Sequence, residues 1–205
     1  MIDYNACADL SNNHEVYLNA GGSAQNTARI FQWLVGPQHC CVYFGSIGSD
    51  EEGTLVETLL RRSGVHTRYT YHRNLPTGRC LALVHGEHRS LVANIGAARI
   101  YAPHHLNTQD NLKVLSQVKI IYIEGFFIAN NFLTAKELIH FCQVKSIILA
   151  FNLKVSCELS VSTKEAMGLL PNASQNNLEV LGLNLAPLAG SVAMNYDHQR
   201  DHKAG

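Results

Sequence analysis

Blocks of apolar and polar positions follow one another along the chain and predict strands and helices in turn. Short apolar runs, which are typical of buried strands, are separated by segments in which apolar residues recur at helical spacing. The predicted strands are 16–19, 40–45, 119–123 and 146–153, and the predicted helices are 23–34, 50–62 and 134–142. Continuous apolar strands separated by helices are typical of a parallel sheet covered on both faces. The pattern between about residues 14 and 153 therefore predicts an α/β domain.

The first two helices have recognisable ends. Helix 23–34 opens after Gly21 and Gly22, and helix 50–62 has Ser49 or Asp50 as its N-cap, because a short polar side chain can accept a hydrogen bond from the free N–H groups there. Gly64 is placed to end the second helix. The apolar positions expected to face the core are Ala28, Phe31 and Leu34 in the first helix and Leu55, Val56 and Leu59 in the second.

Three strand-like runs at short spacing follow the second helix. They cover residues 67–72, 79–84 and 90–94, with turn residues at 75–78 and 85–87 between them. Short strands joined by such turns predict an antiparallel β flap. Beyond residue 153 the chain has little sustained periodicity and is rich in Ser and Asn, so no regular continuation of the strand and helix pattern is expected there.

Composition narrows the classes of partner. The 205 residues include 16 Lys plus Arg and 16 Asp plus Glu, so no basic field is present to attract nucleic acid or an anionic membrane surface. No apolar run approaches the roughly 18 residues that a membrane span needs. We therefore expect a protein of the cytoplasm, with a nuclear location open, that binds neither nucleic acid nor membrane.

Cysteine and histidine spacing gives no sign of a metal site. The six cysteines are scattered without CxxC spacing, and the eleven histidines form no HxH or HExxH pattern. We therefore expect reduced, mostly buried thiols and no metal ligands among these residues.

The segment 19–26, NAGGSAQN, is the first candidate for ligand binding because it leaves a strand and opens a helix. Two glycines allow a positive φ and a close approach of the backbone, and a helix start offers free N–H groups to a polar ligand. A plain strand-to-helix turn capped by Ser23 would produce the same pattern. On this segment alone the two interpretations remain open.

Further motifs follow in order along the chain. They are GSIGSDEEG at 45–53, PTGRC at 76–80, RSLVAN at 89–94 and EGFF at 124–127, with Gln32-Trp33 in the first helix and Asn152-Leu153 after the last strand. Together they resemble the adenosine kinases of the ribokinase-like (PfkB) class, in which a GGSTQN-like turn, GxIGxDxxG, PTGTC, RSLIANL and AGFF occur in this order. The resemblance covers about residues 15–154 and implies a ribokinase-like three-layer α/β/α core with a small antiparallel β lid, incomplete because the chain is truncated at both ends.

The resemblance implies ligand contacts at individual positions. Gly22, Ser23 and Asn26 match residues that hydrogen-bond the ribose, Cys80, Leu91, Ala93 and Phe127 match the wall around the adenine, and Arg89 matches the arginine that stabilises the transferring phosphate. Outside these motifs the same residue types would more often be core residues, a buried thiol or a solvated turn arginine, so the roles depend on the matching motifs.

The resemblance also implies parts that the printed sequence lacks. The family begins with an Asn-x-x-x-Asp strand that binds the ribose, and its second half carries an Asn-x-x-Glu element linked to Mg²⁺ and a Gly-Ala-Gly-Asp turn that supplies the anion hole and the general base. No Gly-Ala-Gly-Asp occurs in this sequence, and NNLE at 176–179 fits Asn-x-x-Glu by letter only. We therefore expect a catalytically incomplete chain that binds ATP and Mg²⁺ weakly.

These expectations define a function and a domain plan. The family phosphorylates adenosine to AMP with ATP in purine salvage, and residues 1–154 are expected to form the N-terminal part of such a kinase domain, with the β lid at about 14–20 and 66–95. Residues 155–205 are expected to be a divergent tail, with disorder one alternative. Two other functions stay open, a non-catalytic nucleoside-binding or regulatory isoform and a fragment of a related sugar kinase. We expect a monomer that binds adenosine and is prone to aggregate because of bared sheet edges.

Overall fold

The structure, a computed structural model, describes residues 16–85, 87–152 and 192–197 of the chain. The chain divides into two compact units, Met1–Ala98 with Leu188–Gly205 and, between them, Arg99–Pro187. No helix among the described residues is long and apolar enough to cross a membrane. Most of the tail predicted at 155–205 lies outside the described residues, so its extent remains a prediction.

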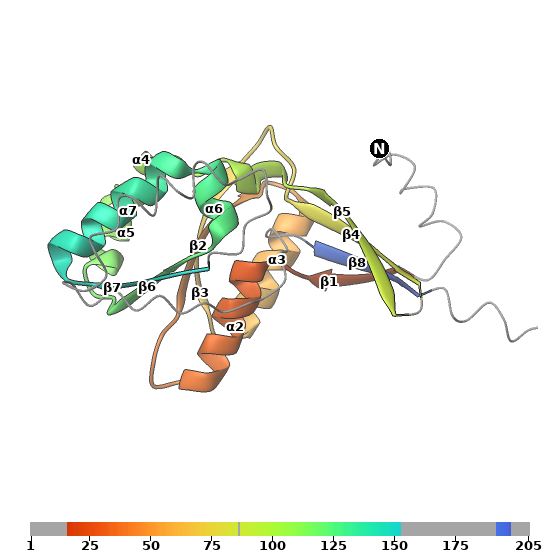
Figure 1. Cartoon of the computed structure of the whole chain (residues 1–205), viewed down its shortest axis with the longest axis horizontal. Coiled ribbons are helices and arrows are strands. Elements are labelled where there is room, and N and C mark those ends of the chain that lie inside the picture. The colour runs from red at the N-terminus through yellow and green to blue at the C-terminus, as the bar shows by residue number, and fades with distance from the viewer. Residues whose placement is uncertain (1–15, 86, 153–191, 198–205) are drawn as a thin grey trace, which may run out of the picture. The chain divides into compact units, whose positions relative to one another are not determined.

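Among the described residues, the first unit contains two sheets and two α-helices (Figure 1). Its elements are β1 (Val16–Ala20), α2 (Ser23–Val35), β2 (Val42–Gly48), α3 (Glu51–Arg62), β3 (His66–His72), β4 (Arg79–His85), β5 (His88–Asn94) and β8 (Val192–Asp197). A 3-10 turn, η1 (Gly96–Arg99), follows β5 and leads to the second unit. The predicted strands and helices of this region are confirmed, with shifts of a few residues at their ends.

Strands β2 and β3 pair in parallel, from Val42 opposite His66 to Gly48 opposite His72. Helix α3 connects them, because two parallel neighbours need a crossover. The prediction that residues 67–72 belong to an antiparallel flap is therefore wrong. The tight turn at Gly64, where φ is 83°, sends the chain back beside β2 before it reaches the flap.

The core of this unit lies between the two helices and the β2–β3 pair. Ala28, Leu60 and Val65 form a buried cluster, and the rings of Tyr43 and Tyr69 pack against it with their centroids 5.5 Å apart. Helix α3 buries Gly53, Val56 and Leu60, whereas the predicted Leu55 and Leu59 are less buried. The buried face of α3 is thus rotated by about one position from the predicted one.

Helix α2 buries a different face from the one its apolar residues predict. Ala28 is buried, but Phe31 and Leu34 are 42% and 68% exposed. Gln32 is buried instead, because its side chain holds the loop that leads to β2. Its Nε2 donates to the carbonyl oxygens of Gly36 and His39, each at 2.9 Å, and its Oε1 accepts from the Cys41 N–H at 2.7 Å.

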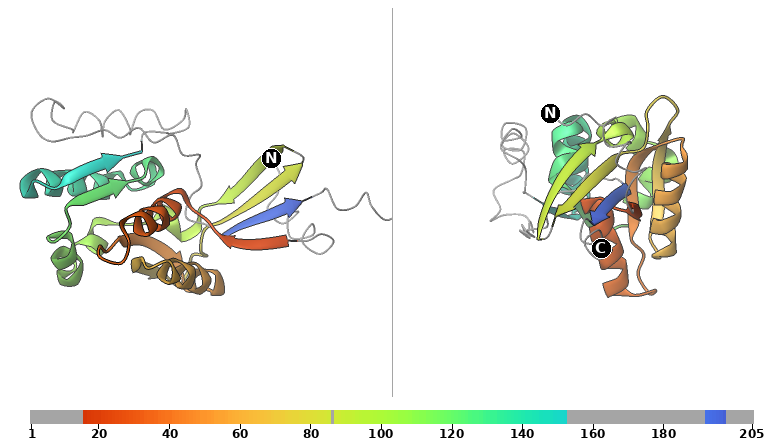
Figure 2. Two further views of the ribbon diagram at one scale, coloured as in Figure 1. Left: turned by 90° about the horizontal axis from the view of Figure 1, so that it is seen from below. Right: turned by 90° about the vertical axis from the view of Figure 1, so that its right-hand side faces the viewer.

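The second sheet of this unit has the order β1-β8-β4-β5. β8 pairs antiparallel with β1 and parallel with β4, and β4 pairs antiparallel with β5 (Figures 1 and 2). The predicted lid is therefore a mixed sheet rather than a purely antiparallel one. It includes a strand from the C-terminal region, for which the sequence pattern predicts no regular structure.

The second unit is a parallel β-α-β arrangement with additional short helices. Its elements are α4 (Pro103–Leu106), α5 (Gln109–Leu115), β6 (Ile120–Ile123), α6 (Gly125–Asn130), α7 (Phe132–Lys145) and β7 (Ile148–Phe151). β6 and β7 pair in parallel from Ile120 opposite Ile148 to Ile123 opposite Phe151. The two strands and α7 are confirmed, whereas α4, α5 and α6 are too short to show a clear apolar period in the sequence.

Candidate functional site

The loop between β1 and α2 carries the residues predicted to bind a sugar. Gly22 is the N-cap of α2 and has a φ of 113°, a conformation that residues other than glycine rarely adopt. Ser23 is only 5% exposed, and its Oγ has no hydrogen-bond partner among the described residues. No side chain in that part of the chain caps the helix. A buried hydroxyl beside uncapped helix N–H groups can bind a ligand hydroxyl.

The β4–β5 hairpin collects the predicted adenine-lining residues and the predicted phosphate-binding arginine on one face. The paired positions are Cys80 with Ala93, Ala82 with Leu91 and Val84 with Arg89. Paired residues point to the same side of a sheet, and every second residue of a strand returns to that side. Cys80, Leu91, Ala93 and Arg89 therefore share one face. Burial raises the pKa of the Cys80 thiol.

One row of the lid sheet connects this hairpin to the loop before α2. Asn19 of β1 pairs with Ala193 of β8, Ala193 pairs with Cys80, and Cys80 pairs with Ala93. β1 runs into Gly21 and Gly22 at this end of the sheet (Figure 2). The predicted ribose-binding loop and the Cys80–Ala93 pair thus lie at the same end of one sheet.

Leu91 and Arg89 lie progressively further from this end. Arg89 is four residues along β5 from Ala93, about 13 Å at the rise of an antiparallel strand. Arg89 is exposed near the turn of the hairpin, so its phosphate-binding role stays a prediction.

The root of the hairpin is held by Asp50, whose sequence position predicts only a helix N-cap. One carboxylate oxygen of Asp50 accepts from the Gly53 N–H at 2.8 Å, and the other accepts from the Thr77 N–H at 2.7 Å. The Thr77 hydroxyl donates to Asp50 and accepts from the Gly48 N–H at 2.9 Å. Asp50 and Thr77 thus join the GSIGSDEEG and PTGRC motifs. The sequence signal for this connection is that Asp50 and Thr77 each lie in one of the motifs of the resemblance.

Glycines allow the same segments to approach closely. A Cβ at Gly48 would lie 2.6 Å from both the Leu75 oxygen and the Thr77 nitrogen, and a Cβ at Gly53 would overlap the carbonyl oxygen of Gly48. Gly96, with a φ of 53°, has the Pro76 oxygen in the space of its absent side chain. These three glycines are therefore required by backbone packing around the hairpin root.

Charge at this root favours an ionised Asp50. Burial raises the pKa of Asp50, but the hydrogen bonds from Thr77 and Gly53 and the nearby Arg79 outweigh burial and bring the pKa below its usual value. Arg79 also forms an ion pair with Glu52 of α3. Arg79 stands where the PTGTC motif of the resemblance has a threonine, a side chain that cannot form an ion pair.

Phe127, the remaining predicted adenine contact, belongs to the second unit. Its ring packs against Tyr101, with centroids 5.9 Å apart. The backbone of Tyr101 is held by Asn131, whose Oδ1 accepts from the Tyr101 N–H at 2.6 Å, and by the Thr134 hydroxyl, which donates to its carbonyl oxygen. Phe126 of the same turn is half-buried.

Glu124 occupies the position of the alanine in the related AGFF turn. It is 7% exposed and accepts hydrogen bonds from the Tyr122 hydroxyl and from Asn152 Nδ2, each at 2.8 Å. Tyr122 lies in β6, Glu124 directly follows this strand, and Asn152 follows β7. The carboxylate therefore ties together the carboxyl ends of the two parallel strands.

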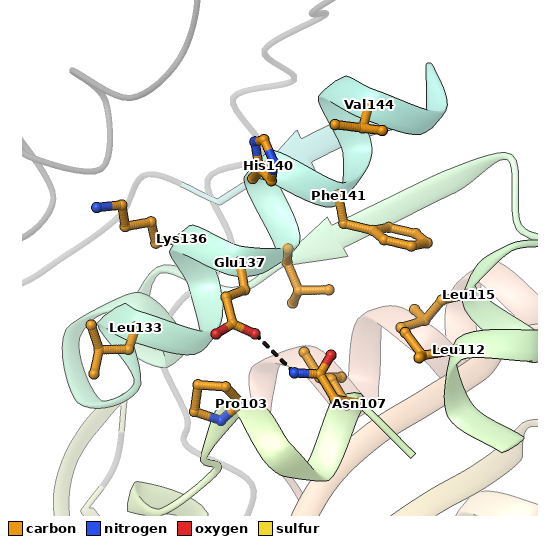
Figure 3. Close-up of a pocket in the computed structure, with 12 residues that line it drawn as sticks. Pro103, Asn107, Leu112, Leu115, Leu133, Lys136, Glu137, His140, Phe141 and Val144 are labelled. Atoms are coloured by element: carbon orange, nitrogen blue, oxygen red, sulfur yellow. Dashed lines mark hydrogen bonds between the residues drawn. The ribbon is translucent and has the colours of Figure 1, made fainter. Parts of the chain in front are cut away.

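A separate apolar groove of about 640 Å³ lies among α4, α5 and α7 of the second unit (Figure 3). Leu106, Leu112, Leu133 and Phe141 contribute to its walls, and Asn107 donates a hydrogen bond of 3.2 Å to Glu137 at its side. None of the predicted ligand-binding residues lines this groove.

Within the described ranges, no group of three or more His, Cys, Asp or Glu side chains is arranged to hold a metal ion. NNLE at 176–179 lies outside these ranges.

A lid sheet with a glycine-rich helix start, in a chain that also contains parallel β-α-β units, defines an α/β kinase of the ribokinase-like class. The model of the pfkB family carbohydrate kinases matches residues 1–157, and the chain belongs to this family. Within the family, the resemblance to adenosine kinases is confirmed by relatives of that name. The adenosine kinase of Dictyostelium discoideum is 34% identical over 108 residues, and that of Saccharomyces cerevisiae is 39% identical over 112 residues.

These matches cover 53% and 55% of this chain but 32% of each relative, so the chain matches about a third of the length of these curated relatives. Anopheles gambiae adenosine kinase in complex with P1,P4-di(adenosine-5) tetraphosphate superimposes with a TM-score of 0.66 at 30% identity, covering 73% of this chain and 43% of that one. Schistosoma mansoni adenosine kinase in complex with adenosine gives 0.72 at 23% identity, over 80% and 48% of the two chains, and supports the fold alone. The predicted ribokinase-like fold class is confirmed.

Proposed function

We propose that this chain carries the nucleoside-binding part of an adenosine kinase, whose complete form transfers a phosphoryl group from ATP to adenosine and yields AMP. The observation that carries the proposal is the buried, unpartnered Ser23 hydroxyl at the uncapped start of α2, among the residues described. Leaving a buried polar group without a partner costs about 1–3 kcal/mol, which a ligand hydroxyl would offset. The names of the related proteins support adenosine as that ligand.

The neighbouring residues suit a purine riboside. The helix start and Asn26 supply hydrogen bonds to a ribose diol, while Cys80, Leu91 and Ala93 offer an apolar surface for a flat base. Phe127 of the second unit keeps its predicted role as an adenine contact, which the resemblance alone supports. Arg89 would serve the phosphate, since a guanidinium can neutralise charge that spreads over phosphoryl oxygens.

Calorimetric titration of the full chain tests the binding step. Adenosine is expected to bind more tightly than ribose, because ribose lacks the base. Ser23→Ala should weaken adenosine binding about tenfold, whereas Ser63→Ala, a serine whose hydroxyl donates to Leu59 at the end of α3, should leave it unchanged. Equal affinity for ribose and adenosine would instead favour a sugar kinase fragment, and no adenosine binding would refute the proposal.

Catalysis by this chain alone is expected to be close to absent. Phosphoryl transfer depends on positioning and charge stabilisation, and the sequence contains no Gly-Ala-Gly-Asp turn to supply the general base. Adenosine binding without phosphoryl transfer, in the presence of ATP and Mg²⁺, would fit both an incomplete kinase and a non-catalytic nucleoside-binding protein of the cytoplasm. Turnover comparable to that of an ordinary kinase, about 1–100 per second, would refute this part of the proposal.

A further inference from the structure

The lid sheet depends on one strand that comes from the end of the chain. Among the described residues, β1 has a single sheet neighbour, β8, and it does not pair with β4. β8 pairs on both sides, with β1 from Val16 to Ala20 and with β4 from Arg79 to Val84. Without β8, β1 and β4 would both present an unpaired strand edge to a slot one strand wide.

β1 and β4 run antiparallel to each other on the two sides of this slot. β8 fills it by pairing antiparallel with β1 and parallel with β4. Figures 1 and 2 show β8, the blue strand, between β1 and β4. β8 belongs to the first unit, together with β1, β4 and β5.

Both sides of the predicted ligand site meet at this strand. On one side, β1 leads through Ala20 into Gly22 and Ser23, and on the other, β4 and β5 carry the Cys80–Ala93 pair. Ala193 is the register partner that lies between Asn19 and Cys80. The separation and register of the two sides are therefore set by β8.

We propose that β8 is an internal donor strand: by filling the slot between β1 and β4, the C-terminal segment of the chain assembles the nucleoside-binding mouth. The ligand part of this inference rests on the proposed function, whereas the strand insertion does not. Backbone hydrogen bonds to both neighbours supply the affinity, as in other cases where an extended segment is added to sheet edges.

Disulfide trapping tests the insertion in the full chain. Ala193→Cys places a thiol in register with the native Cys80 on a strand about 4.8 Å away, within the range of Cα separations that disulfides span. Met194→Cys is the matched control, because the next position of a strand is expected on the opposite face of the sheet. After mild oxidation with oxidised glutathione, peptide mass mapping should find Cys80 linked to the introduced thiol within one chain in Ala193→Cys. The same mapping should find no such link in Met194→Cys.

Other outcomes of the trapping experiment would overturn the inference. The absence of a link to Cys80 in Ala193→Cys would show that β8 does not occupy the slot. A link between two chains, seen as a covalent dimer, would show that the slot takes its strand from a second copy. Equal linking of Cys80 in Ala193→Cys and in Met194→Cys would show that the strand has no defined register.

Adenosine binding tests the consequence for the ligand site. Met194→Pro removes a ladder N–H from a strand that is paired on both sides, so the dissociation constant for adenosine should rise at least about tenfold, while Met194→Val should change it by less than about twofold. Hydrogen exchange should show that β1 amides lose protection in Met194→Pro and that α3 amides keep it. Unchanged affinity in Met194→Pro, with wild-type binding present, would overturn the inference. Lack of binding by the wild-type chain would refute the proposed function and leave the trapping result to decide on the strand.

Discussion

At the scale of single residues, the motifs that resemble those of adenosine kinases contain residues with a packing role. Gly48, Gly53 and Gly96 are positions where backbone from another segment occupies the space of a side chain. Asp50 and Thr77 connect these segments by hydrogen bonds. The strict spacing of the motifs therefore follows from the close approach of α3, the 75–78 turn and η1.

In Gly53→Ala, a gain in stability from helix propensity competes with a loss from overpacking. Alanine in a helix interior is favoured over glycine by about 0.5–1 kcal/mol, but overpacking costs about 1–3 kcal/mol. Because the new Cβ would overlap the Gly48 carbonyl oxygen, which belongs to backbone, we expect a net loss of stability in a urea unfolding experiment. Thr54→Ala, at the exposed next position of α3, is the control and should leave the midpoint nearly unchanged. A stabilised Gly53→Ala protein would contradict the close approach.

Asp50 should make stability depend on pH. Its folded-state pKa is lower than its unfolded value, so its contribution is fully present above the unfolded pKa of about 3.9 and is lost as pH falls through the folded pKa. Urea unfolding between about pH 6 and pH 3 should therefore show a smaller loss of stability in Asp50→Asn than in the wild type. Equal losses in the two proteins would show that Asp50 is not held ionised by its partners.

At the scale of elements, α2 shows how a polar residue can determine which face of a helix is buried. Gln32 makes three hydrogen bonds to the loop before β2, whereas the adjacent Trp33 is 79% exposed. The Gln-Trp pair that resembles the adenosine kinases thus contains one structural residue and one surface residue.

Substitution of Gln32 should lower the stability of the protein much more than substitution of Trp33. Gln32→Leu leaves the Cys41 N–H and two carbonyl groups without their partner and should lower the free energy of unfolding by about 1–3 kcal/mol. Trp33→Ala, which removes a much larger apolar side chain, should change it by less than about 0.5 kcal/mol because the ring lies in solvent. Urea unfolding of the two variants gives the comparison, and the reverse order would refute this account of α2.

At the scale of the whole molecule, exposed apolar side chains gather on the last turns of α2. Ile30, Phe31, Trp33 and Leu34 are each more than 40% exposed, an unusual concentration of apolar side chains for one protein surface. We expect this surface to favour self-association of the purified chain.

Leu34→Glu should reduce that self-association. The substitution places a charge within the exposed apolar surface, at a residue that is 68% exposed, so folding should be little affected. Light scattering at increasing protein concentration is the measurement, and Thr54→Glu, which adds the same charge at an exposed position of α3, is the control. An equal reduction by both substitutions would attribute the effect to net charge rather than to the α2 surface.

Local pattern was sufficient for much of the fold. β1, α2, α3, β3 and the β4–β5 hairpin fall close to their predicted ranges, because each has its own periodicity and its own turn or cap residues. The N-cap of α3 is Asp50, one of the two residues predicted for this position. Short helices such as α5 escaped prediction because about two turns give too little apolar repetition.

The candidate site was predictable only in part. Motif order singled out Ser23, Cys80 and Ala93, but their common location at one end of a sheet depends on pairing between segments that are distant along the chain. The buried state of the Ser23 hydroxyl and the Asp50–Thr77 connection likewise depend on which segments meet. No local pattern encodes those contacts.

By itself, the sequence determined the α/β class, the position of the glycine-rich helix start and the hairpin, because periodicity, caps and turns act between near neighbours along the chain. Only the tertiary structure decided that β3 pairs in parallel with β2, that α2 buries Gln32 rather than Phe31, and that β8 enters the lid. These outcomes depend on hydrogen bonds and packing between distant segments, and their free energy exists only when the segments are brought together.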